Sequence, residues 1–210
     1  MLQLYYSPGA CSLAVHIALA ASGAEYELVD SRIIDGKTRT AEFLRLNDRA
    51  RVPVLVREGQ AFREAVAILI GLDEWFPRAG LMPPADSIER QYCLEWLSFF
   101  TSTFHPLYWG VWRKHRLVSD ESHHADLDAT SRLQLLKAYA HTEEQLQDRQ
   151  YLLCDKPYAC DYYAYVFVRW AYRIFDQIPQ FPRLEAYNEQ LSGLPVVQKA
   201  LTAEGLKPLT

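Results

Sequence analysis

Cys11 is the residue of this 210-residue chain whose type and position most favour chemistry. Residues 3–6 are typical of the end of a short strand, Ser7-Pro8-Gly9 of a turn, and residues 10–21 of a helix that Gly23 ends. Cys11 is therefore predicted in the first helical turn, where open backbone N–H groups and the helix dipole favour a thiolate. The position indicates a nucleophile or redox centre; the alternative is a small buried apolar residue.

Composition indicates a globular protein and argues against several classes of partner. Half of the residues are hydrophobic, enough for one large domain or two small ones, and the net charge of −4 argues against a nucleic-acid partner. No apolar run reaches the length of a membrane span, and no signal sequence precedes the first strand, so we expect no membrane contact. His123-His124 has no third ligand at a useful spacing, so we expect no metal. The cysteines are interpreted as reduced thiols of a cytoplasmic protein: Cys11, Cys93, Cys154 and Cys160.

The elements that follow Cys11 predict an α/β unit. Residues 25–30 alternate polar and apolar side chains, as a half-buried strand does, and a strand-helix-strand order favours a parallel pair. Thr40 is a suitable cap for a short helix through Leu46. Pro53 lies at the start of an aliphatic strand, where its missing N–H suits a strand's first position or a cis turn.

A hairpin and a helix complete this unit. Glu58-Gly59 is a tight turn between two short apolar runs and predicts an antiparallel pair. Glu64 opens a helix with an apolar face that runs to about Phe76, where Pro77 ends it. The predicted order through residue 79 is therefore βαβαββα.

The remainder of the chain carries no strand pattern. Residues 80–86 are rich in Pro and Gly and are interpreted as a linker. We expect an α/β domain over 1–79 followed by an all-helical domain over 87–210. Pro106 is expected to kink or divide the first long helix. The predicted helices cover residues 88–115, about 119–147, 158–175, 183–191 and 195–203.

This order, with its motifs, resembles the cytosolic glutathione S-transferases, and the bacterial beta class most of all. The resemblance implies a thioredoxin-like N-terminal domain, an all-helical C-terminal domain and a cytoplasmic homodimer that acts in detoxification. It also implies glutathione as a co-substrate, with no permanently bound cofactor. It is carried by Leu4-Tyr5-Tyr6-Ser7-Pro8-Gly9-Ala10-Cys11-Ser12-Leu13, His16–Leu19, Val52–Leu55, Glu64–Ile68 and Glu95–Phe99.

The resemblance implies a site for the glutathione thiol around Cys11. In the beta class the matching cysteine lies near the glutathione sulfur and can form a mixed disulfide with it. A histidine matching His105 reaches this site from the helical domain. Hydrogen-bond donors near the sulfur would lower its pKa, and Tyr6, Ser7 and His105 are the candidates here.

The resemblance also implies how the rest of glutathione is held. The proline matching Pro53 is cis, and the backbone of the preceding Val52 pairs with the cysteinyl part like an added strand. The acidic residue matching Glu64, with the residue after it, holds the γ-glutamyl end. A lysine in the loop after the second strand, here Lys37, meets the glycine carboxylate.

A second substrate would lie against the helical domain. Tyr108, Trp109 and Trp112 share one helical face with His105 and carry large apolar area. That face either lines a pocket for hydrophobic electrophiles or packs into the core.

The sequence departs from the family pattern at three places. Ala65 stands where a serine is expected, so a hydroxyl bond to the γ-glutamyl carboxylate, worth roughly 1.5–3 kcal/mol, is absent. Residues 47–50 lack the glycine that ends the preceding helix in the family. Tyr158 replaces the Ser or Thr that caps the central helix, although Asp161 remains, and Asp155 is a candidate replacement cap.

Three functions remain open from the sequence. The first is conjugation of glutathione to a hydrophobic electrophile. The second is thiol–disulfide exchange through Cys11; no Cys-x-x-Cys pair is present, so a dithiol mechanism is not expected. The third is a ligand- or partner-binding protein that keeps the fold without catalysis, which Ala65 favours.

Overall fold

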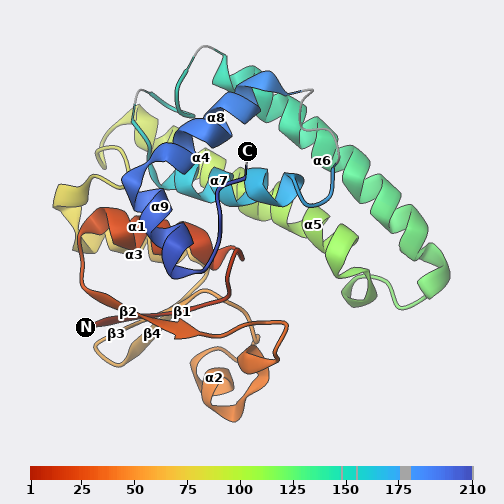
Figure 1. Cartoon of the computed structure of the whole chain (residues 1–210), viewed down its shortest axis with the longest axis horizontal. Helices are drawn as coiled ribbons and strands as arrows, with labels where there is room; N and C mark the ends of the chain where they lie inside the picture. Colours follow the sequence, from red (N-terminus) through yellow and green to blue (C-terminus); the bar gives the residue numbers. More distant parts are fainter. Residues whose placement is uncertain (148, 155, 176–180, 210) are drawn as a thin grey trace.

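The chain folds into a sheet-containing lobe followed by a helical lobe (Figure 1). The computed structural model describes residues 1–147, 149–154, 156–175 and 181–209. The order of the first elements is the predicted βαβαββα. They are β1 (Leu2–Tyr6), α1 (Ser12–Ser22), β2 (Tyr26–Asp30), α2 (Ala41–Leu46), β3 (Val54–Arg57), β4 (Gln60–Arg63) and α3 (Ala65–Trp75).

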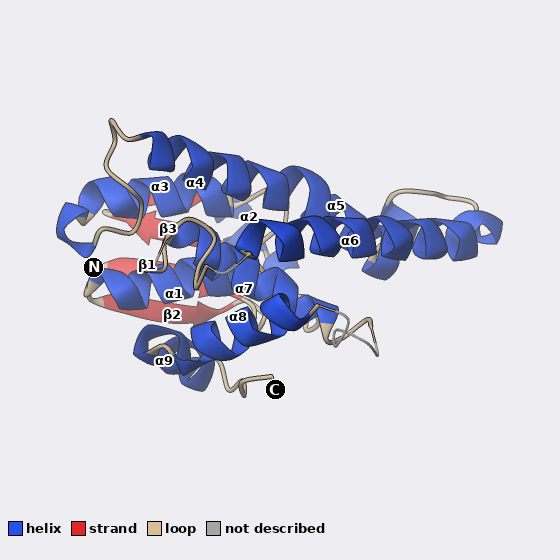
Figure 2. Cartoon of the chain, turned by 90° about the horizontal axis from the view of Figure 1, so that it is seen from above, coloured by secondary structure: helices blue, strands red, loops and turns tan. Residues whose placement is uncertain are grey.

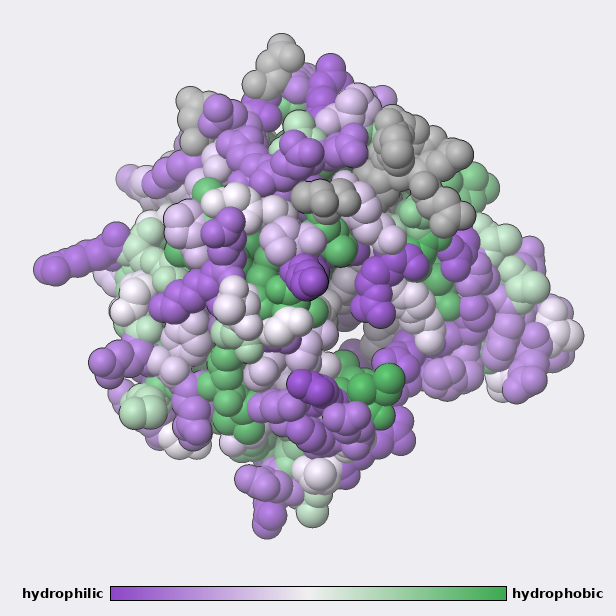
Figure 3. All heavy atoms as spheres, in the orientation of Figure 1, coloured by the Kyte–Doolittle hydropathy of each residue, from purple (hydrophilic) through white to green (hydrophobic). Residues whose placement is uncertain are grey.

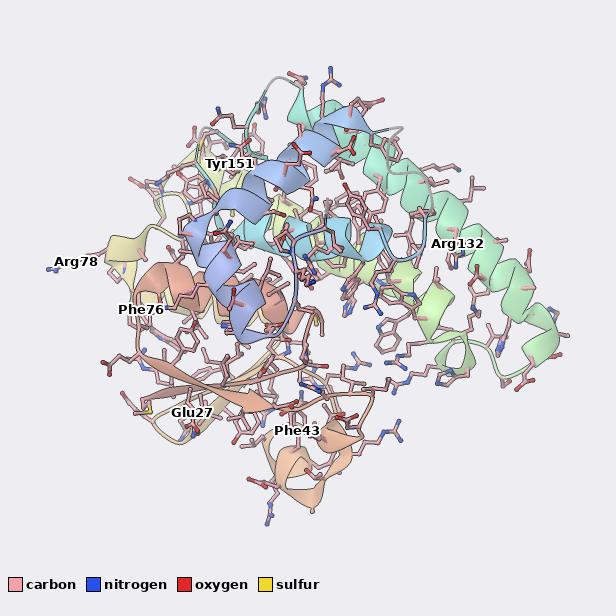
Figure 4. All side chains as sticks on the ribbon, viewed as in Figure 1. Glu27, Phe43, Phe76, Arg78, Arg132 and Tyr151 are labelled. Atoms are coloured by element: carbon pink, nitrogen blue, oxygen red, sulfur yellow. The ribbon has the colours of Figure 1, made fainter. Side chains whose placement is uncertain are left out.

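The four strands form one mixed sheet in the order β2-β1-β3-β4. The pair β1–β2 is parallel and the pair β3–β4 is antiparallel, as the sequence predicted, and β1 also pairs with β3 in antiparallel orientation. Alternate side chains of β1 enter different cores. Leu4 packs into the main core with α1, while Tyr5 packs with Phe43 of α2 on the other face. Helices α1 and α3 therefore cover one face and α2 the other (Figures 1 and 4).

The predicted first long helix of the second lobe is divided, as Pro106 required. A π-helical turn, η3 (Phe100–Phe104), precedes α5 and places Pro106 in the first turn of that helix. The other elements of this lobe are α4 (Ile88–Phe99), α5 (His105–Trp112), η4 (Lys114–Arg116), η5 (Glu121–His123), α6 (His124–Leu146), α7 (Ala159–Ala171), α8 (Pro182–Gly193) and α9 (Pro195–Ala203).

Helix α7 is the centre of the second lobe. Every one of its residues is buried, as its near absence of charge predicted, although it ends at Ala171 rather than Phe175. Figure 2 shows it enclosed by neighbouring helices, while α6 extends well beyond the sheet. The Asp161 carboxylate accepts hydrogen bonds from the N–H groups of Tyr158 and Leu152, at 2.8 and 2.9 Å, and so caps the helix start. The proposed cap Asp155 lies outside the described residues.

Among the described residues, no helix combines the length and the apolar character needed to cross a bilayer.

Candidate active site

The turn that leads to Cys11 is fixed from the C-terminal end of the chain. The N–H of Gly9 donates to Glu204 Oε2 at 2.8 Å, and its carbonyl accepts from Trp170 Nε1 at 2.8 Å. Glu204 Oε1 lies 2.9 Å from His16 Nδ1, and both side chains are fully buried. The segment after α9 and helix α7 therefore hold this turn against α1.

Cys11 is the N-cap of α1 and is almost fully buried. Its Sγ donates to the carbonyl oxygen of Val52 across 3.3 Å. Burial raises the pKa of the Cys11 thiol to about 12, and this outweighs the lowering by backbone N–H groups at 11 and 12. The prediction that the helix start favours a thiolate is therefore wrong, because desolvation exceeds the helix effect.

The segment before β3, residues 47–53, approaches Cys11 through a backbone of defined conformation. The Val52–Pro53 peptide bond is cis, as the resemblance implied. Asn47 Nδ2 donates to the Arg51 carbonyl at 2.7 Å and fixes the approach to this bond. Ala50 has φ of 54°, the left-handed conformation that favours glycine, and it occupies the position where the family pattern has one.

The start of α3 forms the opposite wall. Glu64 is its N-cap with φ of 66°, a strained conformation for a residue with a side chain. Its carboxylate accepts from Arg49 Nη1 at 2.6 Å, and both groups are exposed. The first intrahelical bond runs from the Ile68 N–H to the Glu64 carbonyl, at 3.0 Å. The N–H groups of residues 65–67 are therefore open to an anion.

These elements and α5 enclose a cleft of about 630 Å³. On the face in Figure 3 the surface is hollowed between the two lobes. Seven of the predicted site residues line the cleft: Cys11, Val52, Pro53, Glu64, Ala65, His105 and Trp109. Residues from two distant halves of the sequence thus share one site.

His105 contributes a neutral imidazole to this cleft. It is the first residue of α5 and packs against Trp170 with ring centroids 5.7 Å apart. Burial and, to a smaller extent, the positive charge of Arg51 together lower the pKa of His105 to about 4. At neutral pH the ring therefore offers one donor and one acceptor without a charge.

Three predicted site residues of the sheet lobe lie outside the cleft lining. Tyr6 is buried against His16, and burial raises the pKa of its hydroxyl. Ser7 is buried, and its Oγ accepts from the N–H of Ile33 at 3.4 Å. Lys37 is exposed, and its ammonium pairs with Asp30 at 2.9 Å.

Two of the predicted pocket aromatics are also outside the lining. Tyr108 is fully buried, and its hydroxyl lies 2.6 Å from that of Tyr139. Its side chain therefore packs into the core instead of lining a pocket. Trp112 packs on Tyr108 and Trp170, with ring centroids 4.8 and 5.2 Å away. The helical face that the sequence grouped is split, because only His105 and Trp109 reach the cleft.

Sequence reasoning missed several residues that line the cleft, among them Arg51 and Tyr163. Arg51 lines it, and its guanidinium lies 4.4 Å from the centroid of Trp109. Tyr163 of the buried helix α7 reaches it as well. The available signal for Arg51 was its position directly before Val52-Pro53, while no local pattern distinguishes Tyr163 from the other aromatic residues of α7.

Comparison with known proteins gives one consistent result. Residues 1–73 match the family described as glutathione S-transferase, N-terminal domain. Glutathione S-transferase GstA of Escherichia coli O157:H7 is 30% identical over 208 residues, 98% of this chain and 100% of that protein.

Solved structures agree with this match along the whole chain. A sphingomonad glutathione S-transferase in complex with glutathione has a TM-score of 0.86 at 30% identity. A bacterial beta class enzyme from Sphingomonas chungbukensis has a TM-score of 0.86 at 29% identity. Each covers 97% of this chain and 99% of its own. The chain belongs to the glutathione S-transferase family, as its motifs predicted, and is thereby a transferase with the thioredoxin-like and helical parts of that fold.

Proposed function

We propose that this protein binds reduced glutathione in the cleft and transfers its thiolate to a hydrophobic electrophile. The observation that carries the proposal is the convergence of Cys11, the cis Val52–Pro53 bond and the open start of α3 on one cleft. The glutathione complex of the sphingomonad relative supports the same ligand.

The chemistry of the cleft matches the groups of glutathione. The open N–H groups of residues 65–67 suit the γ-glutamyl carboxylate, and the Glu64 carboxylate suits the ammonium. The backbone of Val52 suits the cysteinyl peptide group. With Lys37 paired to Asp30, Arg51 is the better-placed cation for the glycine carboxylate.

Cys11 acts in this proposal as a hydrogen-bond donor rather than a nucleophile. With its pKa raised to about 12, its S–H stays protonated at neutral pH and can donate to the glutathione sulfur in place of the Val52 carbonyl. Donation stabilises the thiolate and lowers the pKa of the bound thiol. The thiolate then forms the S–C bond as the leaving group departs, and the thiol proton passes to water.

Thiol–disulfide exchange is the second candidate, because Cys11 lines the cleft. Its Sγ would attack a glutathionyl disulfide, and a second glutathione would release the mixed disulfide. The raised pKa weighs against it, since only a thiolate attacks efficiently.

Two assays with the Cys11→Ala variant separate these candidates. The rate of conjugation of 1-chloro-2,4-dinitrobenzene should fall about tenfold but stay measurable. Disulfide exchange would be abolished. Cys154→Ala, which removes a partly exposed thiol of the helical lobe, is the control and should change neither rate. Absence of glutathione binding to the wild-type protein at millimolar concentration would refute both candidates and leave the ligand-binding alternative.

We also propose that the protein is a cytoplasmic homodimer that pairs through α3 and α4. Its apolar side chains at the start of α4 support this, since Ile88 and Tyr92 are 61% and 51% exposed. Light scattering of the purified protein tests the dimer, and a monomeric mass at micromolar concentration would contradict it.

A further inference from the structure

Two arginine side chains, one from each lobe, lie against the ring of Trp109, which lines the cleft, and two more lie near enough to Arg116 for their charges to act on it. Arg51 and Arg116 place their guanidinium carbons 4.4 and 5.7 Å from the centroid of the Trp109 ring. Burial lowers the pKa of Arg116, and the positive charges of Arg113, Arg39 and Arg51 lower it further. Residues from the sheet lobe and from the turn after α5 thus form one basic cluster beside Trp109.

The positive charge of this cluster is not balanced within the described part of the chain. None of these arginines has a described carboxylate within 4 Å, whereas neighbouring basic residues do. Lys114 pairs with Asp128 at 2.6 Å and also donates to the Val111 carbonyl at 2.7 Å. The η4 turn is therefore anchored by Lys114, while Arg113 and Arg116 on either side of it have no carboxylate partner among the residues that the structure describes.

Glutathione accounts for only part of this charge. Its glycine carboxylate carries one negative charge, and Arg51 lies directly beside the Val52 backbone that would hold the cysteinyl group. Arg113 and Arg116 come from the helical lobe, and Arg116 lies beside Trp109 and directly precedes Leu117, both of which line the cleft. Their position fits a second ligand better than glutathione.

We propose that the second substrate is an anion, an aromatic electrophile with a carboxylate or sulfonate group. Its ring lies against Trp109 and Leu117, and its anionic group lies between Arg113 and Arg116. This inference rests on the proposed function, because it names the substrate class for the same cleft. The anionic group takes no part in the reaction: the glutathione sulfur bonds to the electrophilic carbon and the leaving group departs with its electron pair.

Binding of two probes that differ in one sulfonate tests the proposal without requiring catalysis. The probes are 8-anilinonaphthalene-1-sulfonate and the neutral N-phenyl-1-naphthylamine, titrated by fluorescence into protein saturated with glutathione. The wild-type protein should bind the sulfonate at least fivefold more tightly than the neutral probe. The preference should fall as ionic strength rises.

Charge-removing variants locate the binding site. Arg113→Gln and Arg116→Gln should each weaken sulfonate binding by about three- to fivefold and leave the neutral probe unchanged. Arg116→Lys should retain most of the affinity. Arg78→Gln, an exposed arginine far from the cleft in Figure 4, is the matched control and should have no effect.

Conjugation rates extend the test to the reaction. The wild-type protein should use 4-chloro-3,5-dinitrobenzoate with a lower KM than 1-chloro-2,4-dinitrobenzene, and the two Gln variants should lose this difference. Equal binding of both probes, or a preference that survives both variants, would overturn the proposal. So would an equal loss of glutathione affinity in these variants, because the cluster would then serve glutathione. Failure of glutathione binding in the wild-type protein refutes the proposed function, whereas the probe titrations without glutathione still report on the anion site.

Discussion

The Cys11 sulfur lies 3.3 Å from the carbonyl oxygen of Val52, the residue that precedes the cis proline. This contact joins the start of α1 to the segment before β3 and places the thiol inside the cleft. The thiol is buried at this contact, and burial is the largest cause of its raised pKa. The position that brings Cys11 to the cleft thus keeps it protonated.

The first prediction concerns the reactivity of Cys11. Alkylation by iodoacetamide, followed by mass spectrometry of the peptide that contains Cys11, should be slow at pH 7 and still rising at pH 10. The reason is that the pKa is near 12 and only the thiolate reacts. A rate that reaches its plateau below pH 8 would show that the helix start dominates after all.

The second prediction concerns acid stability. The folded pKa of His105 is about 4 and its unfolded value about 6.5, so between these pH values the unfolded chain binds a proton that the folded chain does not. Lowering the pH from 7 to 4 should therefore remove about 3 kcal/mol of unfolding free energy through His105. Urea titrations should show this loss in the wild-type protein and a smaller one in His105→Gln. Identical pH profiles would contradict the assignment.

The third prediction concerns the buried pair His16–Glu204. Glu204→Gln removes the charge that accepts from the Gly9 N–H and from His16. The variant should lose about 3 kcal/mol of unfolding free energy, because its former partners stay buried. Glutathione affinity of the folded fraction should also fall, since Gly9 precedes Cys11 in the turn. Glu189→Gln, an exposed residue of α8, is the control; an equal, small effect of both changes would refute the role.

The fourth prediction concerns backbone strain at Ala50. A φ of 54° destabilises the folded state by roughly 1 kcal/mol for a residue with a Cβ atom. Glycine adopts this conformation without that strain. Ala50→Gly should therefore raise the free energy of unfolding by about 0.5 kcal/mol without changing glutathione affinity. A decrease in the denaturation midpoint would contradict this.

Local patterns predicted the elements but not the environment of their side chains. Alternation and turn residues predicted the strands and the hairpin at Glu58-Gly59, because these signals are local. The pKa of Cys11 could not be predicted, since it depends on burial under residues from the other half of the chain. The contact between Arg51 and Trp109 also joins distant segments, and helical periodicity alone did not separate Trp109 in the cleft from Tyr108 in the core.

The central claim, that α3 begins at the γ-glutamyl end of bound glutathione, is tested most directly by calorimetry of Ala65→Ser. Glutathione should bind the variant about tenfold more tightly than the wild-type protein, because the new hydroxyl donates to the γ-glutamyl carboxylate. The affinity for cysteinylglycine, which lacks that carboxylate, should not change in this variant. Ala79→Ser, at a position outside the cleft, should leave the affinity for both ligands unchanged. An equal gain for both ligands, or no gain for glutathione, would contradict the account.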